Sequence, residues 1–221
     1  MATSAKRLIG KTLNPVSDES LMKQYANGDF AAFETLYARN KGGLYRYLLR
    51  QLRDQSLTED IFQDVWGKVI TNAAEYQTTA KFTTWLYTIA RNKVIDNKRH
   101  MKLVDGAIEK DKLFDDQTMS IDEQAQASSI SQQPHALHES TEQSLAIEHC
   151  LQKLPRHQLE AFLLREEAGL SAQHIADIVN TNLEATKSRL KVAFKNLREC
   201  LNLKLALEHQ ASSANIKEPR L

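Results

Sequence analysis

Cationic and hydroxyl side chains recur along one side of a helix predicted between Lys81 and Arg99. At 100° per residue, one side of this helix collects Thr84, Thr88, Arg91, Lys98 and Lys102. The opposite side is apolar and aromatic, with Phe82, Trp85, Leu86, Ile89 and Ala90. Lysine and arginine in a row can neutralise successive phosphates, and hydroxyls can donate to them. The pattern therefore indicates either a polyanion-binding face or an ordinary solvated face, and we expect Trp85 to pack in the core rather than stack on a base.

A second candidate for polyanion binding is a helix, a turn and a longer helix predicted from Ser171 to Leu201. Ser171 suits a helix N-cap, and Asn180 suits a left-handed turn residue. On the longer helix the buried side is expected to comprise Leu183, Leu190, Phe194, Leu197 and Leu201. Its exposed side carries Glu184, Lys187, Ser188, Lys191, Lys195 and Arg198. This layout is typical of a helix-turn-helix that reads a DNA groove.

The charge of the chain is unevenly distributed. Of 221 residues with a net charge of +1, the segment 103–148 holds ten acids and two bases, so the remainder carries +9. Two basic parts separated by an acidic one suit polyanion binding at both ends. The middle is also rich in Gln, Ser and Asp without a hydrophobic period, which predicts a flexible linker.

Several compositional features indicate the cellular compartment. No apolar run is long enough to span a membrane, and the N-terminus lacks the apolar core of a secretory signal. Cys150 and Cys200 are far apart, so we expect free thiols in a reducing compartment. The chain is therefore expected to be soluble and cytoplasmic, without direct membrane insertion.

The periodicity of apolar residues predicts an all-α fold. Helices are expected to begin after Ser17, after Asp29 and after Ser56 or Thr58, with a possible irregularity at Gly42-Gly43. No alternating pattern strong enough for a sheet occurs. We expect two small helical domains joined by the acidic linker.

Three segments carry a resemblance to a known family. They are TEDIFQDVWGKVI (58–70), FTTWLYTIARNKVIDNKR (82–99) and, beyond the linker, the stretch 154–198 that begins LPRHQLEAFLLREE. In order and spacing they closely resemble the extracytoplasmic-function (ECF) branch of bacterial RNA polymerase sigma factors. The resemblance implies a flexible lead-in at 1–16, a region 2 domain at 17–101, a linker at 102–141, a region 4 helix-turn-helix domain at 142–202 and a tail at 203–221.

The resemblance also implies three binding surfaces. The acidic helix would dock on the clamp helices of the largest polymerase subunit through Asp60, Gln63 and Asp64. The downstream (minus ten) promoter element would be opened, and a flipped base held, by Tyr76, Lys81, Thr84, Thr88, Arg91, Lys93, Lys98 and Arg99. The upstream (minus thirty-five) element would be read by Glu184, Lys187, Ser188, Arg189, Lys191 and Lys195. The chain departs from the family's habit at Val192 and Phe194, where further Arg or Lys is usual, and at Ala185-Thr186, where a Thr-Val pair is usual. These departures leave the base preference open.

The implied partners are the polymerase core, promoter DNA and an anti-sigma factor. No cofactor, metal or small-molecule substrate is expected. A stand-alone helix-turn-helix regulator would explain only the second domain. An enzyme is disfavoured, because His135, His138 and His149-Cys150 complete no zinc spacing and no glycine-rich phosphate loop occurs.

Overall fold

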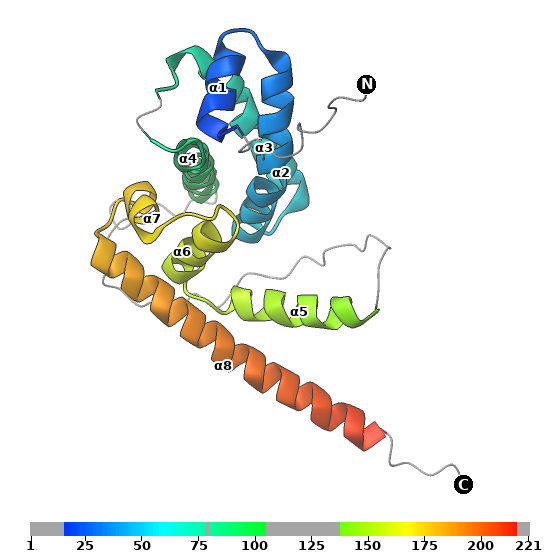
Figure 1. Ribbon diagram of the computed structural model, residues 1–221. Coiled ribbons are helices and arrows are strands. Elements are labelled where there is room, and N and C mark those ends of the chain that lie inside the picture. The colour runs from blue at the N-terminus through cyan, green and yellow to red at the C-terminus, as the bar shows by residue number, and fades with distance from the viewer. Residues whose placement is uncertain (1–15, 78–79, 105–137, 216–221) are drawn as a thin grey trace, which may run out of the picture.

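The computed structural model of the chain describes residues 16–77, 80–104 and 138–215 (Figure 1). The expected lead-in and most of the expected linker lie outside these ranges. The described residues form helices joined by short connections, and no strand occurs among them, which confirms the all-helical prediction. The helices are α1 (Asp18–Ala26), α2 (Phe30–Leu52), α3 (Gln55–Thr71), the 3-10 turn η1 (Ala73–Glu75), α4 (Phe82–Val104), α5 (His138–Gln152), α6 (Arg156–Glu166), α7 (Ala172–Val179) and α8 (Leu183–Asn215).

Side chains cap several helices where the sequence predicts it. The Ser17 hydroxyl accepts from the Ser20 N–H at the start of α1, and Asp29 accepts from the N–H groups of Ala31 and Ala32. Ser171 caps α7 in the same way. Asn180 ends α7 with a φ of 55°, the left-handed conformation expected of it.

Two local predictions need correction. Helix α3 begins one residue before Ser56, because the Asp54 carboxylate accepts from the Leu57 N–H at 2.8 Å and serves as the N-cap. Helix α2 shows no irregularity at Gly42-Gly43 and continues from Phe30 to Leu52. The end of that helix is marked instead by Arg53 in a left-handed conformation.

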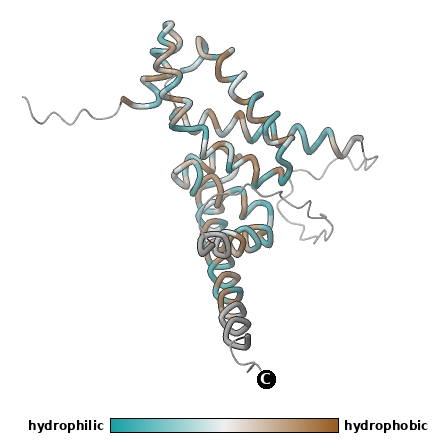
Figure 2. The backbone as a smooth tube through the Cα atoms, turned by 90° about the vertical axis from the view of Figure 1, so that its right-hand side faces the viewer, coloured by the Kyte–Doolittle hydropathy of each residue, from teal (hydrophilic) through white to brown (hydrophobic). Residues whose placement is uncertain are grey.

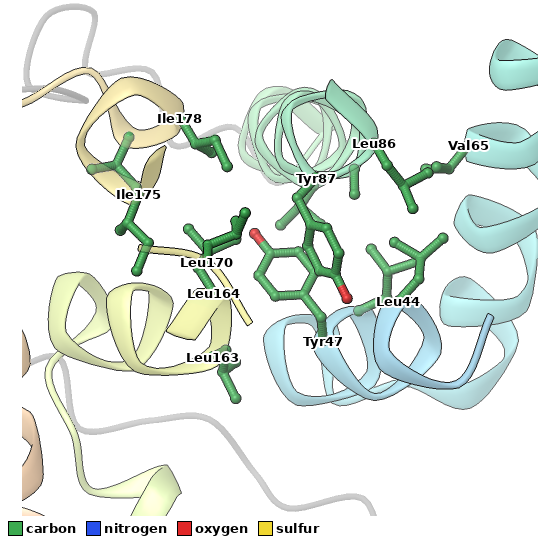
Figure 3. Packing of buried hydrophobic residues seen from close by; sticks show 14 of the residues in the cluster. Leu44, Tyr47, Val65, Leu86, Tyr87, Leu163, Leu164, Leu170, Ile175 and Ile178 are labelled. Carbon is green, nitrogen blue, oxygen red and sulfur yellow. The ribbon is translucent and has the colours of Figure 1, made fainter. Parts of the chain in front are cut away.

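The core is one continuous apolar cluster that joins the two expected domains. Helices α1 to α4 surround Leu36, Leu44, Leu48, Val65 and Phe82, all fully buried. Figure 3 shows Tyr47 of α2 and Tyr87 of α4 facing Leu164, Leu170 and Ile178 of the second half. Helices α6 and α7 therefore pack against α2 and α4, and the two halves form a single body (Figure 1).

Helix α8 projects well beyond this body (Figure 1), and its course alternates between hydrophilic and hydrophobic residues (Figure 2). Its first half packs on α5, α6 and α7, with Thr186, Ala193 and Leu197 buried. Phe194 was expected on the buried side, but it is 40% exposed and its ring meets that of Phe162 edge-on. Ala193, one residue earlier, occupies the packed position.

Cys150 of α5 and Cys200 of α8 form a disulfide, with a sequence separation of 50 residues and a Cα–Cα distance of 5.8 Å. The expectation of free thiols was therefore wrong. Sequence distance misled, because the helix reversals at α6 and α7 bring α5 and α8 side by side.

Candidate nucleic-acid interface

The hydroxyl-bearing side of α4 is covered in this structure. Thr84 is buried, and its Oγ1 has no hydrogen-bond partner among the described residues. The Thr88 hydroxyl donates to the Thr84 carbonyl at 2.7 Å. Both hydroxyls were predicted to face a DNA strand, and here they lie against neighbouring protein or the helix's own backbone.

Two cations of the same helix face are also engaged by the second half of the chain. Arg91 donates from Nε to Glu160 of α6 at 2.9 Å, and the two side chains are only 13% and 19% exposed. Burial, with the nearby cations Arg156 and Arg53, lowers the pKa of Lys98 to about 8, although Glu160 acts in the opposite direction. The predicted phosphate-binding side of α4 is therefore turned towards α6.

Lys93 and Arg99 lie closer to solvent. Lys93 donates to Asp64 of α3 at 2.6 Å, and Arg99 lies 3.9 Å from Asp96 on its own helix. Their side chains are 37% and 46% exposed, respectively. A DNA strand could therefore reach these two of the residues predicted on α4 for the downstream element, even with the two halves packed as they are here.

Tyr76, which lies between η1 and α4, is held by aromatic packing. The ring of Tyr76 lies 5.1 Å from that of Trp85 and 6.1 Å from that of Phe82, and its hydroxyl donates to the Ala80 carbonyl at 3.1 Å. Burial, followed by the charges of Glu19 and Asp18, raises the pKa of Tyr76 to about 12. Trp85 packs against the core, as predicted. Lys81 is exposed beside this cluster.

The predicted upstream set lies on the outer side of α8. The Asn182 side chain caps this helix by accepting from the Ala185 N–H at 2.7 Å. Glu184, Lys187, Ser188, Lys191 and Lys195 are placed towards the outer side, while Arg189 is half-buried. Lys187 pairs with Glu184 at 2.8 Å. The α7–turn–α8 unit thus presents a mainly cationic helix face that would fit a DNA major groove.

The predicted polymerase-binding residues lie on the surface of α3. Asp60, Gln63 and Asp64 are all exposed. Half-buried aromatic rings lie next to them: Phe62 meets Tyr45 at 5.7 Å and Tyr37 at 6.3 Å, both edge-on. An acidic helix flanked by partly exposed aromatic rings is well suited to bind another protein.

Sequence reasoning missed four charged residues. Arg46 and Arg50 of α2 bind the carboxylate of Glu167, the residue that follows α6, and Glu160 binds Arg91. The spacing of Arg46 and Arg50 by four residues puts them on one face of α2, a signal present in the sequence. The carboxylate partner of Arg46 and Arg50 lies more than a hundred residues away and gave no such signal.

Other classes of site are not evident in the described ranges. None of the described helices combines the length and the apolarity needed to cross a membrane. Among the same residues, no three His, Cys, Asp or Glu side chains converge as metal ligands would.

Comparison with known protein families accounts for both halves. Residues 36–102 match the family model of Sigma-70 region 2, and residues 144–197 match that of Sigma-70, region 4. The chain belongs to the ECF type of the sigma-70 family. As a sigma factor it initiates transcription, and sigma factors are not enzymes. They act on promoter DNA together with the RNA polymerase core.

Individual relatives agree along most of their length. The sigma factor is 29% identical to the ECF RNA polymerase sigma factor SigK of Mycolicibacterium vanbaalenii over 191 residues, covering 84% of this chain and 89% of that one. It is 28% identical to the sigma factor CarQ of Myxococcus xanthus over 180 residues, covering 81% and 95%.

Solved structures share the fold. CnrH in complex with the cytosolic domain of CnrY matches with a TM-score of 0.56 at 19% identity, covering 85% of this sigma factor and 99% of that chain. RpoE of Bartonella quintana in complex with the anti-sigma factor NepR matches with a TM-score of 0.55 at 22% identity, covering 77% and 96%.

Proposed function

We propose that this sigma factor divides promoter recognition between α4 and α8 and binds the polymerase through α3. Asp60, Gln63 and Asp64 bind the clamp helices of the largest polymerase subunit. The segment from Tyr76 to Lys81 and the cationic side of α4 hold the opened downstream element. The outer face of α8 reads the upstream element. Residues 17–101 and 142–202 act as regions 2 and 4, and 102–141 links them.

The observation that carries this proposal is the contrast between the two sides of α8. Thr186, Ala193 and Leu197 anchor one side in the core, while Lys187 lies exposed on the other. A recognition helix needs both properties, because base readout requires that side chains be held in a fixed register over the groove. The Asn182 cap and the left-handed Asn180 fix the angle at which this helix leaves the turn.

The downstream assignment is supported by aromatic packing between Tyr76 and the first turn of α4. The rings of Tyr76, Phe82 and Trp85 pack on one another. A protein that opens DNA without a nucleotide cofactor must capture unstacked bases on a rigid surface, since capture supplies the free energy of opening. Lys81, just before α4, and Lys93 and Arg99, farther along α4, are the cations proposed to neutralise strand phosphates.

An anti-sigma factor is the further partner we propose, acting with this protein in the cytoplasm. Two structurally similar proteins, CnrH and the Bartonella quintana RpoE, were solved with partner proteins bound. In this chain, exposed apolar side chains on α5 and α8 provide a surface suited to such a partner: Leu145, Ile147, Leu203 and Leu205.

Reconstituted transcription tests the proposal. Bacterial core polymerase is incubated with a randomised promoter library, with and without this protein, and the transcripts are sequenced. We expect transcripts that start downstream of a shared pair of sequence elements and that require both components. Transcription that does not respond to the protein would contradict the proposal. The double variant Lys187→Ala, Lys191→Ala should lose the upstream element from the enriched promoters and keep the downstream one.

A further inference from the structure

Glu167 joins the two halves of the molecule. Its carboxylate accepts from Arg46 Nε at 2.7 Å and also from Arg50, and only 6% of its side chain is exposed. Its backbone carbonyl accepts from the Tyr87 hydroxyl at 3.3 Å. A carboxylate this well covered is stable only while its cations stay in place. One residue of the second half is therefore held by both α2 and α4.

Additional polar contacts surround this one. Arg91 of α4 and Glu160 of α6 form a second, largely buried ion pair. Arg53 at the end of α2 donates to the Gln152 carbonyl at the end of α5, at 3.4 Å. We call the residues Arg46, Arg50, Arg91, Glu160 and Glu167 the interdomain latch.

The latch depends on a close approach of two backbones. A Cβ on Gly43 of α2 would lie 2.5 Å from the Glu167 carbonyl oxygen and 3.0 Å from the Tyr87 hydroxyl oxygen. The backbone at Glu167 would have to move to relieve the shorter of these distances. Glycine at this position lets α2 reach the end of α6, and the apolar residues drawn in Figure 3 then close around Tyr47 and Tyr87.

The positive charge of this interface exceeds what the two carboxylates neutralise. Arg46, Arg50 and Arg91 are paired there, and Lys98, Arg53 and Arg156 lie close enough to one another for the two arginines to lower the pKa of the lysine. Arginine binds carboxylate and phosphate through the same planar set of donors. A surface of this kind suits a polyanion better than it suits two isolated carboxylates.

We propose that the structure is a closed, self-blocked form, in which the carboxylates of Glu160 and Glu167 occupy a cationic surface that takes promoter DNA phosphates when the domains separate. The proposal rests on the proposed function and extends the downstream DNA surface to Arg46 and Arg50 of α2. In the closed form Arg91 is 13% exposed, so a DNA strand cannot reach it. Val104 and His138 are far enough apart in the sequence that the covalent chain allows the two halves to lie tens of ångströms apart.

The test uses the full chain without polymerase, so that its outcome is independent of sigma activity. The variant Glu167→Arg places a cation against Arg46 and Arg50, and Glu166→Arg makes the same charge change on the adjacent exposed residue. Small-angle scattering measures domain separation, and fluorescence anisotropy measures binding of a labelled single-stranded oligonucleotide.

For Glu167→Arg we expect a larger radius of gyration than for Glu166→Arg. Its affinity for the oligonucleotide should be higher by about tenfold or more, because the open form that binds DNA is no longer a minor population. Saturating oligonucleotide should also increase the radius of gyration of the wild-type protein. If the two variants bind alike, or if the DNA-bound wild type stays as compact as the free protein, the latch does not block the DNA surface.

Gly43→Ala provides a second route to the open form without any change of charge. Alanine favours the helix over glycine, so unfolding of α2 is not expected, and the added Cβ acts on the contact with Glu167 and Tyr87. Gly67→Ala is the matched control, because nothing lies within 4 Å of its added Cβ. Only Gly43→Ala should open the domains. If Gly43→Ala opens the domains but does not support transcription, the proposed function is contradicted and the latch is not. If Gly43→Ala stays compact, the latch proposal is contradicted and the proposed function is not.

Discussion

Lys93 of α4 and Asp64 of α3 form an ion pair at 2.6 Å. The two residues were assigned to different partners, Lys93 to the DNA strand and Asp64 to the polymerase. Their contact means that the two surfaces meet along one edge of the first domain. A partner that withdraws Asp64 would release Lys93 to bind phosphate, so polymerase binding and strand binding would favour each other at this edge.

Charge reversal on α3 tests the polymerase surface. The double variant Asp60→Lys, Asp64→Lys should abolish retention by immobilised core polymerase, because it places cations where the proposed contact with the clamp helices needs acids. The protein should lose only about 0–1 kcal/mol of unfolding free energy, since the Lys93 pair is a surface pair. Glu34→Lys with Glu75→Lys makes the same change of charge at other exposed positions and should leave retention intact. Equal retention of both double variants would remove α3 from the docking surface.

Acid should weaken a contact between α1 and α4. The Phe82 N–H at the start of α4 donates to Glu19 of α1 at 3.0 Å. Burial raises the pKa of Glu19, but hydrogen bonds from Phe82, its own N–H and Ser17, with the charge of Lys81, outweigh it, so the pKa lies below its ordinary 4.5.

A lowered folded-state pKa stabilises the protein above pH 4.5, and this contribution disappears as the pH falls through the folded value. We expect Glu19→Ala to unfold more easily than wild type by about 0.5–2 kcal/mol at neutral pH. The difference should shrink in urea titrations performed at pH values well below that ordinary pKa. If the difference in unfolding free energy between the two proteins were the same at every pH, the charge of Glu19 would contribute nothing to stability.

Reduction should destabilise the second half of the chain. A disulfide that closes a loop of 50 residues stabilises the folded state by about 4 kcal/mol in the chain-entropy description. We therefore expect dithiothreitol to lower the urea midpoint measured by circular dichroism. The double variant Cys150→Ala, Cys200→Ala should behave like the reduced protein, with or without reductant. A wild-type midpoint unaffected by reductant would argue against this pairing in solution.

Salt dependence should report the phosphate contacts proposed for α8. Lys187→Ala with Lys191→Ala should flatten the log–log slope of promoter binding by the holoenzyme by about one unit for each phosphate that the variant no longer binds. Lys23→Ala with Lys153→Ala removes the same charge from α1 and from the residue after α5, and its slope should match that of wild type. If both double variants gave the wild-type slope, neither lysine of α8 would contact phosphate.

Local features of the fold were predictable because their causes are local. Ser17, Asp29 and Ser171 cap helices through bonds to residues two or three positions away, and Asn180 adopts the left-handed conformation that few other residues tolerate. Asp54 was missed because two nearby hydroxyl residues looked equally suitable as caps. Phe194 was misplaced because α8 buries its small Ala193, and not the large ring, against the rest of the second half.

Contacts between distant segments were not predictable from one sequence. The cationic stripe of α4 was recognised, but its partner Glu160 on α6 gave no sign of complementarity. The pairing of Cys150 with Cys200 and the covering of Thr84 likewise follow from how the helices pack. Helical periodicity tells which residues share a face, and it does not tell what the face contacts.

Glycine in the middle of α2 makes that helix weaker than its length suggests. Alanine at position 43 would favour the helix by about 1 kcal/mol, yet it would collide with the carbonyl of Glu167. The first domain is therefore intrinsically less stable than it could be, and only the assembled chain offsets the deficit. Gly43 therefore weakens the first domain and, by the same absence of a side chain, allows the two halves to pack together.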